Sequence, residues 1–378
     1  MRALLAGARR KQADLIAFTR RLVLVESPSD QKAAVDACLA LAAARGRQLG
    51  GRIRIHRQHS SGNVLEIRFG PRKSAVKPIL LLGHLDTVWP LGTLETMPFR
   101  VRAGRVWGPG TLDMKVGVAM AFTAIELLSE SGRLQREIVF LLTADEEVGS
   151  TASRPIIEAL AKASSAVYVL EPAQGLAYKT ARKGIGNWRI EVAGVAAHAG
   201  VDFEKGANAI RELARVIERV SYWTNLDRGL TVSVGVVGGG TKSNVVPAHA
   251  WAEVEARIVR RADGPRIERE FAALKVLKLF DPRCTLTVTG GINRPPMERS
   301  RGTVRLFRQA QALARELDFA LDEASTGGGS DGNFTAALGV PTLDGMGAVG
   351  EGAHARHESV LIEHLAPRTA LLAAMLAN

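Results

Sequence analysis

The chain has 378 residues, of which 46% are hydrophobic, and its 50 basic and 38 acidic side chains give a formal net charge of +12. This length exceeds what one hydrophobic core normally organises, so we expect two domains. The basic residues are scattered and aromatic residues make up only 5%, which argues against a nucleic-acid-binding protein.

Other features of the composition point to a cytoplasmic enzyme or binding protein. No apolar run approaches the roughly 20 residues that a membrane span needs. The N-terminal segment has a very short apolar stretch and makes a poor signal peptide. Only Cys38 and Cys284 are present, far apart in the sequence, which excludes a disulfide framework and fits a reducing cytoplasm.

The first half of the sequence mixes helix and strand patterns. Apolar residues at helical spacing predict helices at 13–26, 32–45 and 116–128. Alternating patterns predict half-buried strands at 52–56 and 63–69, and a hairpin at 101–106. Continuous apolar runs predict buried strands of a parallel sheet at 79–82, 138–142 and 167–170.

From about residue 179 the pattern changes to alternating strands with interspersed helices. The predicted elements are strand, helix, strand, strand, helix and strand, at 185–192, 207–220, 230–236, 250–259, 266–279 and 285–289. This order suggests an α+β sandwich with the sheet on one side and helices on the other. The helix-rich pattern then returns, with a helix at 304–317, a strand at 341–343 and a closing amphipathic helix.

Side chains that can bind metals follow the apolar runs. His84 and Asp86 come directly after the run at 79–82, and their spacing of two puts them on one face of an extended chain. This pair alone fits a core histidine satisfied by an aspartate as well as it fits a metal site. Asp113 precedes the helix at 116–128, where it is either a helix cap or an anionic ligand.

The other strand ends are also rich in carboxylates. Three consecutive acids, Asp145 to Glu147, follow the second apolar run, and their mutual repulsion requires a cation or a shared proton. Glu171 follows the third run, and His354 lies 183 residues later (354 − 171). We therefore expect a domain interrupted by an insertion, with residues 1–178 and 293–378 forming one domain and 179–292 the other.

The candidate ligands combine imidazole with carboxylate, a set that suits zinc, manganese or cobalt. They are His84, Asp113, Glu147, Glu171 and His354. Five ligands exceed what one tetrahedral ion with an open position can use. They suit two ions bridged by one carboxylate, roughly 3.5–4 Å apart.

With these residues in place, the sequence resembles the dizinc aminoacylase and carboxypeptidase family of metallopeptidases, and within it the glutamate carboxypeptidase branch. The matching stretches run in family order over nearly the whole chain. They are Gly-His84-Leu-Asp86-Thr, Gly-Pro-Gly-Thr-Leu-Asp113-Met-Lys, Asp145-Glu146-Glu147-Val-Gly-Ser, Glu171-Pro, Ala-His198-Ala-Gly, Gly-Gly-Gly-Ser-Asp331 and Gly-Ala-His354-Ala-Arg-His357-Glu358.

The resemblance implies an α/β fold: a mixed, largely parallel sheet sandwiched by helices forms the catalytic domain, which carries an inserted α+β lid and dimerisation domain. It implies that Asp113 bridges two divalent ions, zinc first and cobalt or manganese as alternatives. The terminal ligands would be His84, Glu147, Glu171 and His354. His354 and His357 are both plausible ligands by residue type, and the resemblance implies His354, because the family's ligand histidine precedes a Glu-x-Val motif at this spacing, here Glu358-Ser-Val.

The same resemblance assigns further roles. Asp86 would orient the His84 ring, and Glu146 would act as the general base. The Asp113–Met114 peptide bond would be cis.

His198 would donate to the tetrahedral oxyanion, from the partner subunit in dimeric relatives, although a turn histidine before Gly200 is the simpler interpretation. Asn244 and Arg257 would hold the substrate carboxylate, with Arg257 as an outward strand residue being the alternative. The glycine loop that includes Gly328 and Gly329 would offer amides to the same carboxylate, or would be a flexible turn.

The implied reaction is metal-dependent hydrolysis of a C–N amide bond, which releases a C-terminal, glutamate-like amino acid from a peptidyl or acyl group. The alternative is an N-acyl-amino-acid deacylase of the acetylornithine deacetylase or succinyl-diaminopimelate desuccinylase type. We expect a small-molecule substrate, no nucleic-acid or membrane partner, and a homodimer formed through the inserted domain. A non-catalytic protein of the same fold would have lost Glu146 or a ligand, and this chain retains them all.

Overall fold

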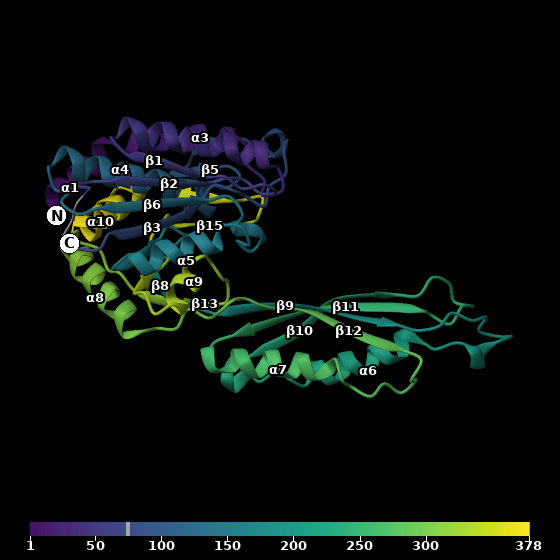
Figure 1. Ribbon diagram of the computed structural model, residues 1–378. Coiled ribbons are helices and arrows are strands. Elements are labelled where there is room, and N and C mark those ends of the chain that lie inside the picture. Colours follow the sequence, from purple (N-terminus) through teal and green to yellow (C-terminus); the bar gives the residue numbers. More distant parts are fainter. Residues whose placement is uncertain (73–75, 378) are drawn as a thin grey trace. The chain divides into compact units, whose positions relative to one another are not determined.

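The computed structural model describes residues 1–72 and 76–377, and it divides into two compact units (Figure 1). Unit 1 contains Met1–Ala181, Arg299–Thr326 and the chain from Ser330 onward, and unit 2 contains Arg182–Glu298 and Gly327–Gly329. The division falls at 181/182 and 298/299, whereas the sequence analysis placed it at 178/179 and 292/293. Unit 2 extends past residue 292 because its last strand, β12 (Thr285–Arg294), continues to Arg294 and residue 297 bridges back to residue 182.

The main sheet of unit 1 has six strands. Their order is β1 (Arg52–His56), β2 (Val64–Phe69), β6 (Ile138–Thr143), β3 (Ile79–His84), β7 (Ala166–Val169) and β14 (Thr342–Leu343). The four strands from β6 to β14 are parallel, whereas β1 and β2 join in antiparallel fashion. The expected mixed, largely parallel α/β sheet is therefore confirmed.

Helices cover both faces of this sheet, and both faces are buried. Successive side chains of a strand point to opposite faces, so one strand contributes to two cores. Leu80 and Leu82 of β3 belong to a core that they share with α5 (Arg154–Ala163) and α9 (Gly332–Ala337). Ile79 and Leu81 belong to a larger core on the other face. The helices that share that core are α1 (Arg2–Arg10), α2 (Gln12–Leu24), α3 (Lys32–Gln48), α4 (Val116–Glu130), α8 (Arg301–Arg315) and α10 (Leu365–Ala377).

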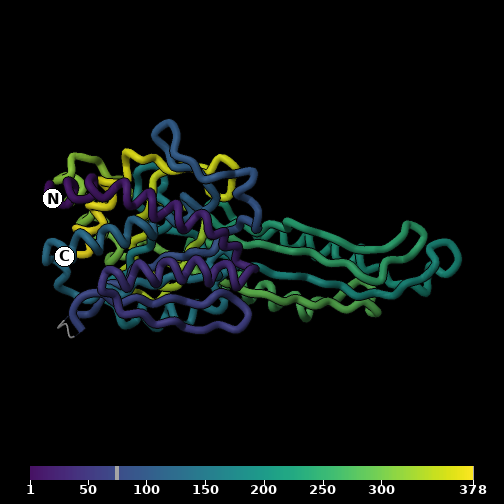
Figure 2. The backbone as a smooth tube through the Cα atoms, turned by 90° about the horizontal axis from the view of Figure 1, so that it is seen from above, coloured from purple at the N-terminus to yellow at the C-terminus, as the bar shows by residue number. Residues whose placement is uncertain are grey.

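The last helix, α10, differs from the expected amphipathic helix. Every residue from 365 to 376 except Pro367 is buried, because the helix packs against α1, α4 and α8. Figure 2 shows α1 and α10 together at one end of unit 1. A helix that is apolar on all sides is a core helix, and the apolar sequence of α10 is consistent with this. Among residues 1–72 and 76–377, no helix has both the length and the hydropathy of a membrane span.

A small second sheet in unit 1 joins two loops that are distant in sequence. The expected hairpin is present as β4 (Arg100–Arg102) and β5 (Arg105–Trp107). Strand β16 (Ser359–Leu361) pairs with β5, and β15 (Gly350–Glu351) pairs with β16. The chain before helix α4 is thereby held beside the segment around residues 350–360.

Unit 2 is the expected α+β sandwich. Its antiparallel sheet has the order β10 (Thr231–Gly239), β11 (His249–Ile258), β9 (Gly184–Ala193) and β12. Helices α6 (Ala209–Ser221) and α7 (Gly264–Leu274) supply the other half of its core. Within this core the rings of Trp188 and Phe271 stack with centroids 4.0 Å apart.

Candidate metal centre

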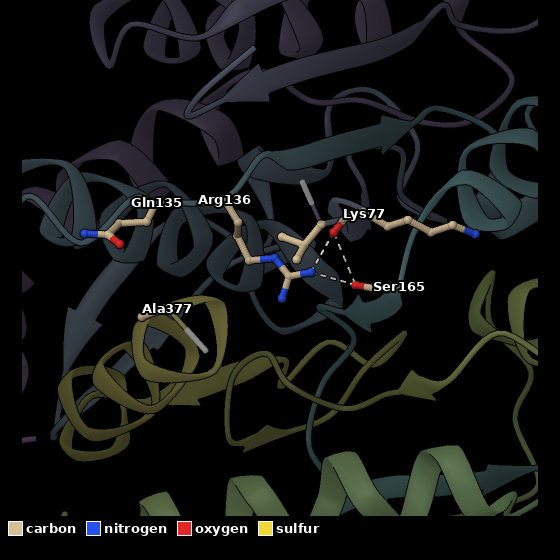
Figure 3. Close-up of a pocket in the computed structure, with 6 residues that line it drawn as sticks. Lys77, Gln135, Arg136, Ser165 and Ala377 are labelled. Carbon is tan, nitrogen blue, oxygen red and sulfur yellow. Dashed lines mark hydrogen bonds between the residues drawn. The ribbon is translucent and has the colours of Figure 1, made fainter. Parts of the chain in front are cut away.

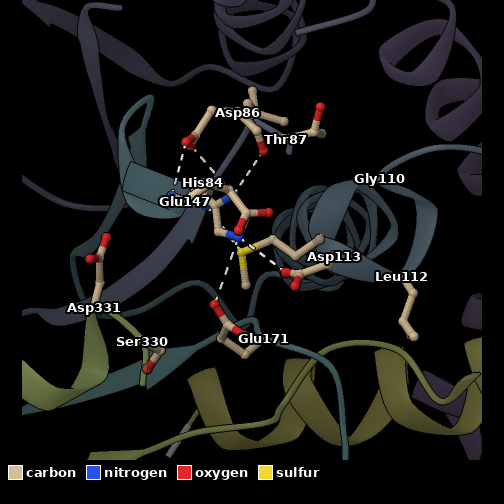
Figure 4. Close-up of polar contacts among 12 residues, drawn as sticks. His84, Asp86, Thr87, Gly110, Leu112, Asp113, Glu147, Glu171, Ser330 and Asp331 are labelled. Carbon is tan, nitrogen blue, oxygen red and sulfur yellow. Dashed lines mark hydrogen bonds and ion pairs between the residues drawn. The ribbon is translucent and has the colours of Figure 1, made fainter. Parts of the chain in front are cut away.

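Three neighbouring parallel strands of unit 1 end in side chains that can bind metals. His84 is the last residue of the central strand β3. Strand β6, on one side, leads into the turn that contains Glu146 and Glu147, and β7, on the other side, is followed by Glu171. Because the carboxyl ends of parallel strands share one edge of the sheet, the side chains of His84, Glu147 and Glu171 meet there (Figure 4).

The five predicted ligands converge around Asp113. His84 Nε2 lies 3.1 Å from Asp113 Oδ1 and 3.7 Å from Glu171 Oε1. His354 Nε2 lies 3.3 Å from Asp113 Oδ2 and 3.2 Å from Glu147 Oε2. The two oxygens of Asp113 therefore face two different imidazoles, and the Nε2 atom of each imidazole also lies near one further carboxylate, Glu171 or Glu147.

The centre is strongly polarised and only partly buried: the side chain of His84 is 2% exposed, whereas that of His354 is 49% exposed. Burial lowers the pKa of His84, but hydrogen bonds with Asp113 and Asp86 outweigh it and hold that pKa well above its usual value. A hydrogen bond with Asp113 raises the pKa of His354 to about 10. Burial opposes ionisation of Asp113, yet the two imidazoles hold its pKa far below the usual range. Asp113 is thus stabilised by positive charge, whereas burial raises the pKa of Glu147. Divalent cations supply positive charge where such ligands are deprotonated.

Asp86 supports two of the ligands from a fully buried position. Its Oδ2 accepts hydrogen bonds from Ser29 Oγ at 2.8 Å and from the amide of Glu147 at 3.1 Å. His84 Nδ1 lies 3.0 Å from the main-chain oxygen of Asp86 and 3.4 Å from Oδ1. The shorter contact makes the main-chain oxygen the acceptor of the Nδ1 proton, which leaves Nε2 free to face Asp113.

The three consecutive acids after β6 do not act alike. Glu146 and Glu147 both face the centre, and Glu146 forms a group with His84 and Glu171 whose ligand atoms lie within 4.8 Å of one another. Asp145 instead turns away, and its Oδ2 accepts a hydrogen bond from the amide of Ala152 at 2.8 Å. Asp145 therefore holds the turn in place, and it is not one of the five candidate ligands.

The loop that carries Asp113 connects β5 to α4 through irregular backbone. Gly110 has a left-handed conformation with φ of 68°, and the Asp113–Met114 peptide bond is cis, as the resemblance implied. Glu358, which enters the sequence pattern only through its spacing from His354, has a buried carboxylate that accepts hydrogen bonds from this loop. The available signal was its position directly before the β-strand that follows His354.

Two of the predicted residues in unit 2 lie next to each other. His198 is exposed, and its Nδ1 accepts hydrogen bonds from the amides of Gly200 and Val201, both at 3.1 Å. In the neutral ring these contacts leave the proton on Nε2, which suits a hydrogen-bond donor. The amide of Ala199 donates to the main-chain oxygen of Asn244 at 2.9 Å, which places Asn244 beside the histidine.

Arg257 and the glycine loop form a second group in unit 2. Arg257 Nε and Nη2 donate to the two oxygens of Glu255, both at 2.8 Å. Its Nη1 donates to the carbonyl of the first glycine of the loop Gly327–Gly329, at 3.0 Å. Arg182 Nη1 donates to the carbonyls of the other two glycines, at 3.2 and 3.0 Å. The loop is thus anchored by two arginines.

A separate hollow of about 550 Å³ lies at the other end of the sheet of unit 1 (Figure 3). Its lining residues precede β3, β6 and β7, together with the end of α10; they are Val76, Lys77, Gln135, Arg136, Ser165 and Ala377. Among the described residues, this lining contains no imidazole or carboxylate side chain. The hollow is therefore no rival to the metal centre.

Comparison with known proteins identifies the family. Residues 80–378 match the family model described as Peptidase family M20/M25/M40. Carboxypeptidase G2 from Pseudomonas sp. (strain RS-16) is 32% identical over 311 residues, which cover 79% of this chain and 73% of that protein. A succinyl-diaminopimelate desuccinylase from Stenotrophomonas maltophilia (strain R551-3) is 27% identical over 349 residues, which cover 87% and 90%.

The fold is also shared with a solved structure. The YXEP protein of Bacillus subtilis, described as a dinuclear metal-binding peptidase from the M20 family, has a TM-score of 0.68 at 15% identity and covers 98% of both chains. The family match spans most of the sequence, and the metal-type side chains of unit 1 gather at one edge of its sheet. The chain therefore belongs to Peptidase family M20/M25/M40 and is a hydrolase of the metallopeptidase type.

Proposed function

We propose that this chain hydrolyses a C–N amide bond with the help of two divalent metal ions held by His84, Asp113, Glu147, Glu171 and His354. The observation that carries the proposal is the position of Asp113, whose two oxygens face different histidines at 3.1 and 3.3 Å. Each half of the centre then offers one imidazole, one terminal carboxylate and one oxygen of the bridge. Three protein ligands per ion leave a coordination position open, as catalytic sites require.

The chemistry of the donors favours zinc, with cobalt or manganese as alternatives. All five proposed ligands are nitrogen or oxygen donors, and both cysteines are free and buried elsewhere. When bound, the two ions lower the pKa of water and polarise the scissile carbonyl. Asp86 orients His84 through its main-chain oxygen and holds the amide of Glu147 with its carboxylate.

Glu146 is the proposed general base. It lies in a group with His84 and Glu171, close enough to reach a water molecule at the centre. It is not needed to complete either half of the ligand set. Its carboxylate would take a proton from that water and pass it to the leaving nitrogen.

For the substrate we propose a peptidyl or acyl amino acid whose C-terminal residue, glutamate-like, is released. The similarity to carboxypeptidase G2 supports this choice. Arg257, Asn244 and the amides of Gly328 and Gly329 would bind the substrate carboxylate, which would replace Glu255 on the guanidinium. N-acyl-amino-acid deacylation is the alternative, and the similarity to a desuccinylase favours it.

We also propose that the protein forms a homodimer through unit 2, with His198 of one subunit completing the site of the other. The edge strand β10 supports an interface there. It has no charged residue, and Val236 and Val237 are 49% and 61% exposed. An apolar, unpaired edge strand favours pairing with another chain.

Metal binding should stabilise the protein. Zinc at 100 times the dissociation constant of each site should add about 2.7 kcal/mol per bound ion to the free energy of unfolding, since the unfolded chain lacks both sites. Thermal unfolding of the chelator-treated protein with and without zinc measures this. The Asp113→Asn variant should lose the gain, and Mg²⁺, which prefers oxygen ligands, should give a smaller one. Equal unfolding temperatures with and without zinc would contradict the site.

Replacing the proposed base should separate binding from turnover. Glu146→Ala should retain its metal content, measured by mass spectrometry of the dialysed protein. Its kcat should fall by roughly 10²–10⁴, the contribution of a positioned acid or base. Glu363→Ala, at a side chain that is 74% exposed, is the control and should keep wild-type kcat. Normal hydrolysis by Glu146→Ala would show that another group takes the proton.

A substrate panel should distinguish carboxypeptidase from deacylase activity. Peptidyl- and aroyl-glutamates should give higher kcat/KM than N-acetyl and N-succinyl amino acids, and the reverse order would establish the alternative. Arg257→Lys should raise KM more than it lowers kcat, because lysine lacks the bidentate fork. Arg189 pairs with Glu191 and Glu253 on the same sheet. The Arg189→Lys variant is therefore the control, and it should leave both constants unchanged.

Co-expression of two inactive variants tests the dimer. His198→Ala and Glu146→Ala should each be inactive alone, but a heterodimer contains one site with both residues intact if His198 acts across the interface. Restored activity, together with a dimeric mass by light scattering, is the expected result. A monomer at every concentration, or a dimer without restored activity, would place His198 within its own subunit or outside the mechanism.

A further inference from the structure

A buried carboxylate lies beneath the loop that carries Asp113. Glu358 is 1% exposed and accepts four hydrogen bonds. Its Oε1 accepts from the amides of Leu112 at 2.8 Å and Asp113 at 3.1 Å. Its Oε2 accepts from the amide of Gly110 at 2.9 Å and from Trp89 Nε1 at 3.0 Å. Three of its four donors thus lie in the segment 110–113, which ends at Asp113, the proposed bridging ligand.

The loop needs such an acceptor because its backbone is irregular. Gly110 is left-handed, and Asp113 has φ of −116° and ψ of 93°, which is neither helix nor a paired strand. Buried amides outside regular structure must find a partner. A carboxylate is a strong one, because hydrogen bonds to a charged acceptor are roughly twice as strong as neutral ones. Glu358 thereby fixes the backbone from which the Asp113 side chain projects.

Glu358 is also tied to the loop of His354. It lies four residues after His354, and its amide donates to the carbonyl of Ala355 at 2.9 Å. Strand β16 starts at the next residue, Ser359, which pairs with Trp107 at the end of β5. The two segments that bring His354 Nε2 within 3.3 Å of Asp113 Oδ2 are therefore joined by a strand pairing and by this carboxylate.

We infer that Glu358 is a positioning residue for the metal centre: its carboxylate sets the place of the Asp113 backbone relative to the His354 loop. The inference rests on the proposed function, because it assigns Asp113 and His354 to one metal ion. Its carboxylate accepts from three main-chain amides of the Asp113 loop and from Trp89, so we assign its effect to the backbone of that loop. Loss of its geometry should weaken metal binding even where the ligands themselves are intact.

The simpler interpretation is that Glu358 only satisfies buried amides and so contributes to stability. Unit 2 provides a matched control for this alternative. Glu212 is 2% exposed and accepts hydrogen bonds from the amides of Phe280 and Asp281, both at 3.0 Å. It holds a loop that bears no proposed metal ligand. A purely structural role predicts that the two glutamates behave alike when substituted.

The test compares Glu358→Gln with Glu212→Gln. In each variant an amide NH₂ replaces one acceptor oxygen and meets backbone donors, so both metal-free proteins should unfold at lower temperature. Zinc affinity, measured by competition with a chromophoric chelator, should fall by about 10–100-fold in Glu358→Gln, the usual effect of removing a group that supports a ligand. Glu212→Gln should bind zinc as the wild type does. The absorption spectrum of bound Co²⁺ should change in Glu358→Gln alone.

The outcomes separate this inference from the proposed function. If the wild type binds no zinc, the proposed function fails, whatever the variants do. If the wild type binds two ions and Glu358→Gln binds them within about twofold of it, the positioning role is wrong. If Glu358→Gln does not fold, Glu358→Asp keeps the charge with a shorter reach. Weaker zinc binding by that variant supports the role, and unchanged binding overturns it.

Discussion

Repulsion between carboxylates that are held close together is the constraint on which the centre of this protein depends. Asp113, Glu147 and Glu171 lie around two imidazoles at an edge of the sheet where little solvent reaches them. Such a group is stable only when positive charge lies among the carboxylates. In the metal-free chain the imidazoles lie against these carboxylates, and the contacts hold the pKa of His84 well above its usual value and raise that of His354 to about 10.

The surrounding structure holds these charges in place through main-chain contacts. Asp86 accepts a hydrogen bond from the amide of Glu147, and Asp145 accepts one from the amide of Ala152 in the turn after β6. Glu358 accepts one from the amide of Asp113. Each of these supporting carboxylates is buried and accepts at least one backbone amide. In each case a supporting carboxylate holds the backbone that carries a ligand. The ligand side chains therefore need little reorganisation to bind metal.

Much of this arrangement could be predicted from the sequence because apolar strands and the acids that follow them leave a clear local pattern. His84, Glu147 and Glu171 follow that pattern. The alternating strands and amphipathic helices of the insertion also predict its α+β fold. The closing helix was misjudged because amphipathicity is a local property, whereas the burial of α10 on every side depends on α1, α4 and α8. Asp145 and Glu358 could not be assigned, because what distinguishes them is the direction of their side chains and the backbone amides that they accept, and these depend on the fold.

X-ray absorption spectroscopy of the zinc-loaded protein tests the central claim most directly, because it reports the donor atoms and the distance between the metals. The account predicts nitrogen and oxygen ligands at about 2.0–2.2 Å, with a second zinc about 3.5–4 Å away. A sulfur ligand near about 2.3 Å, or an isolated zinc without a neighbouring metal, would contradict a two-metal centre built on Asp113.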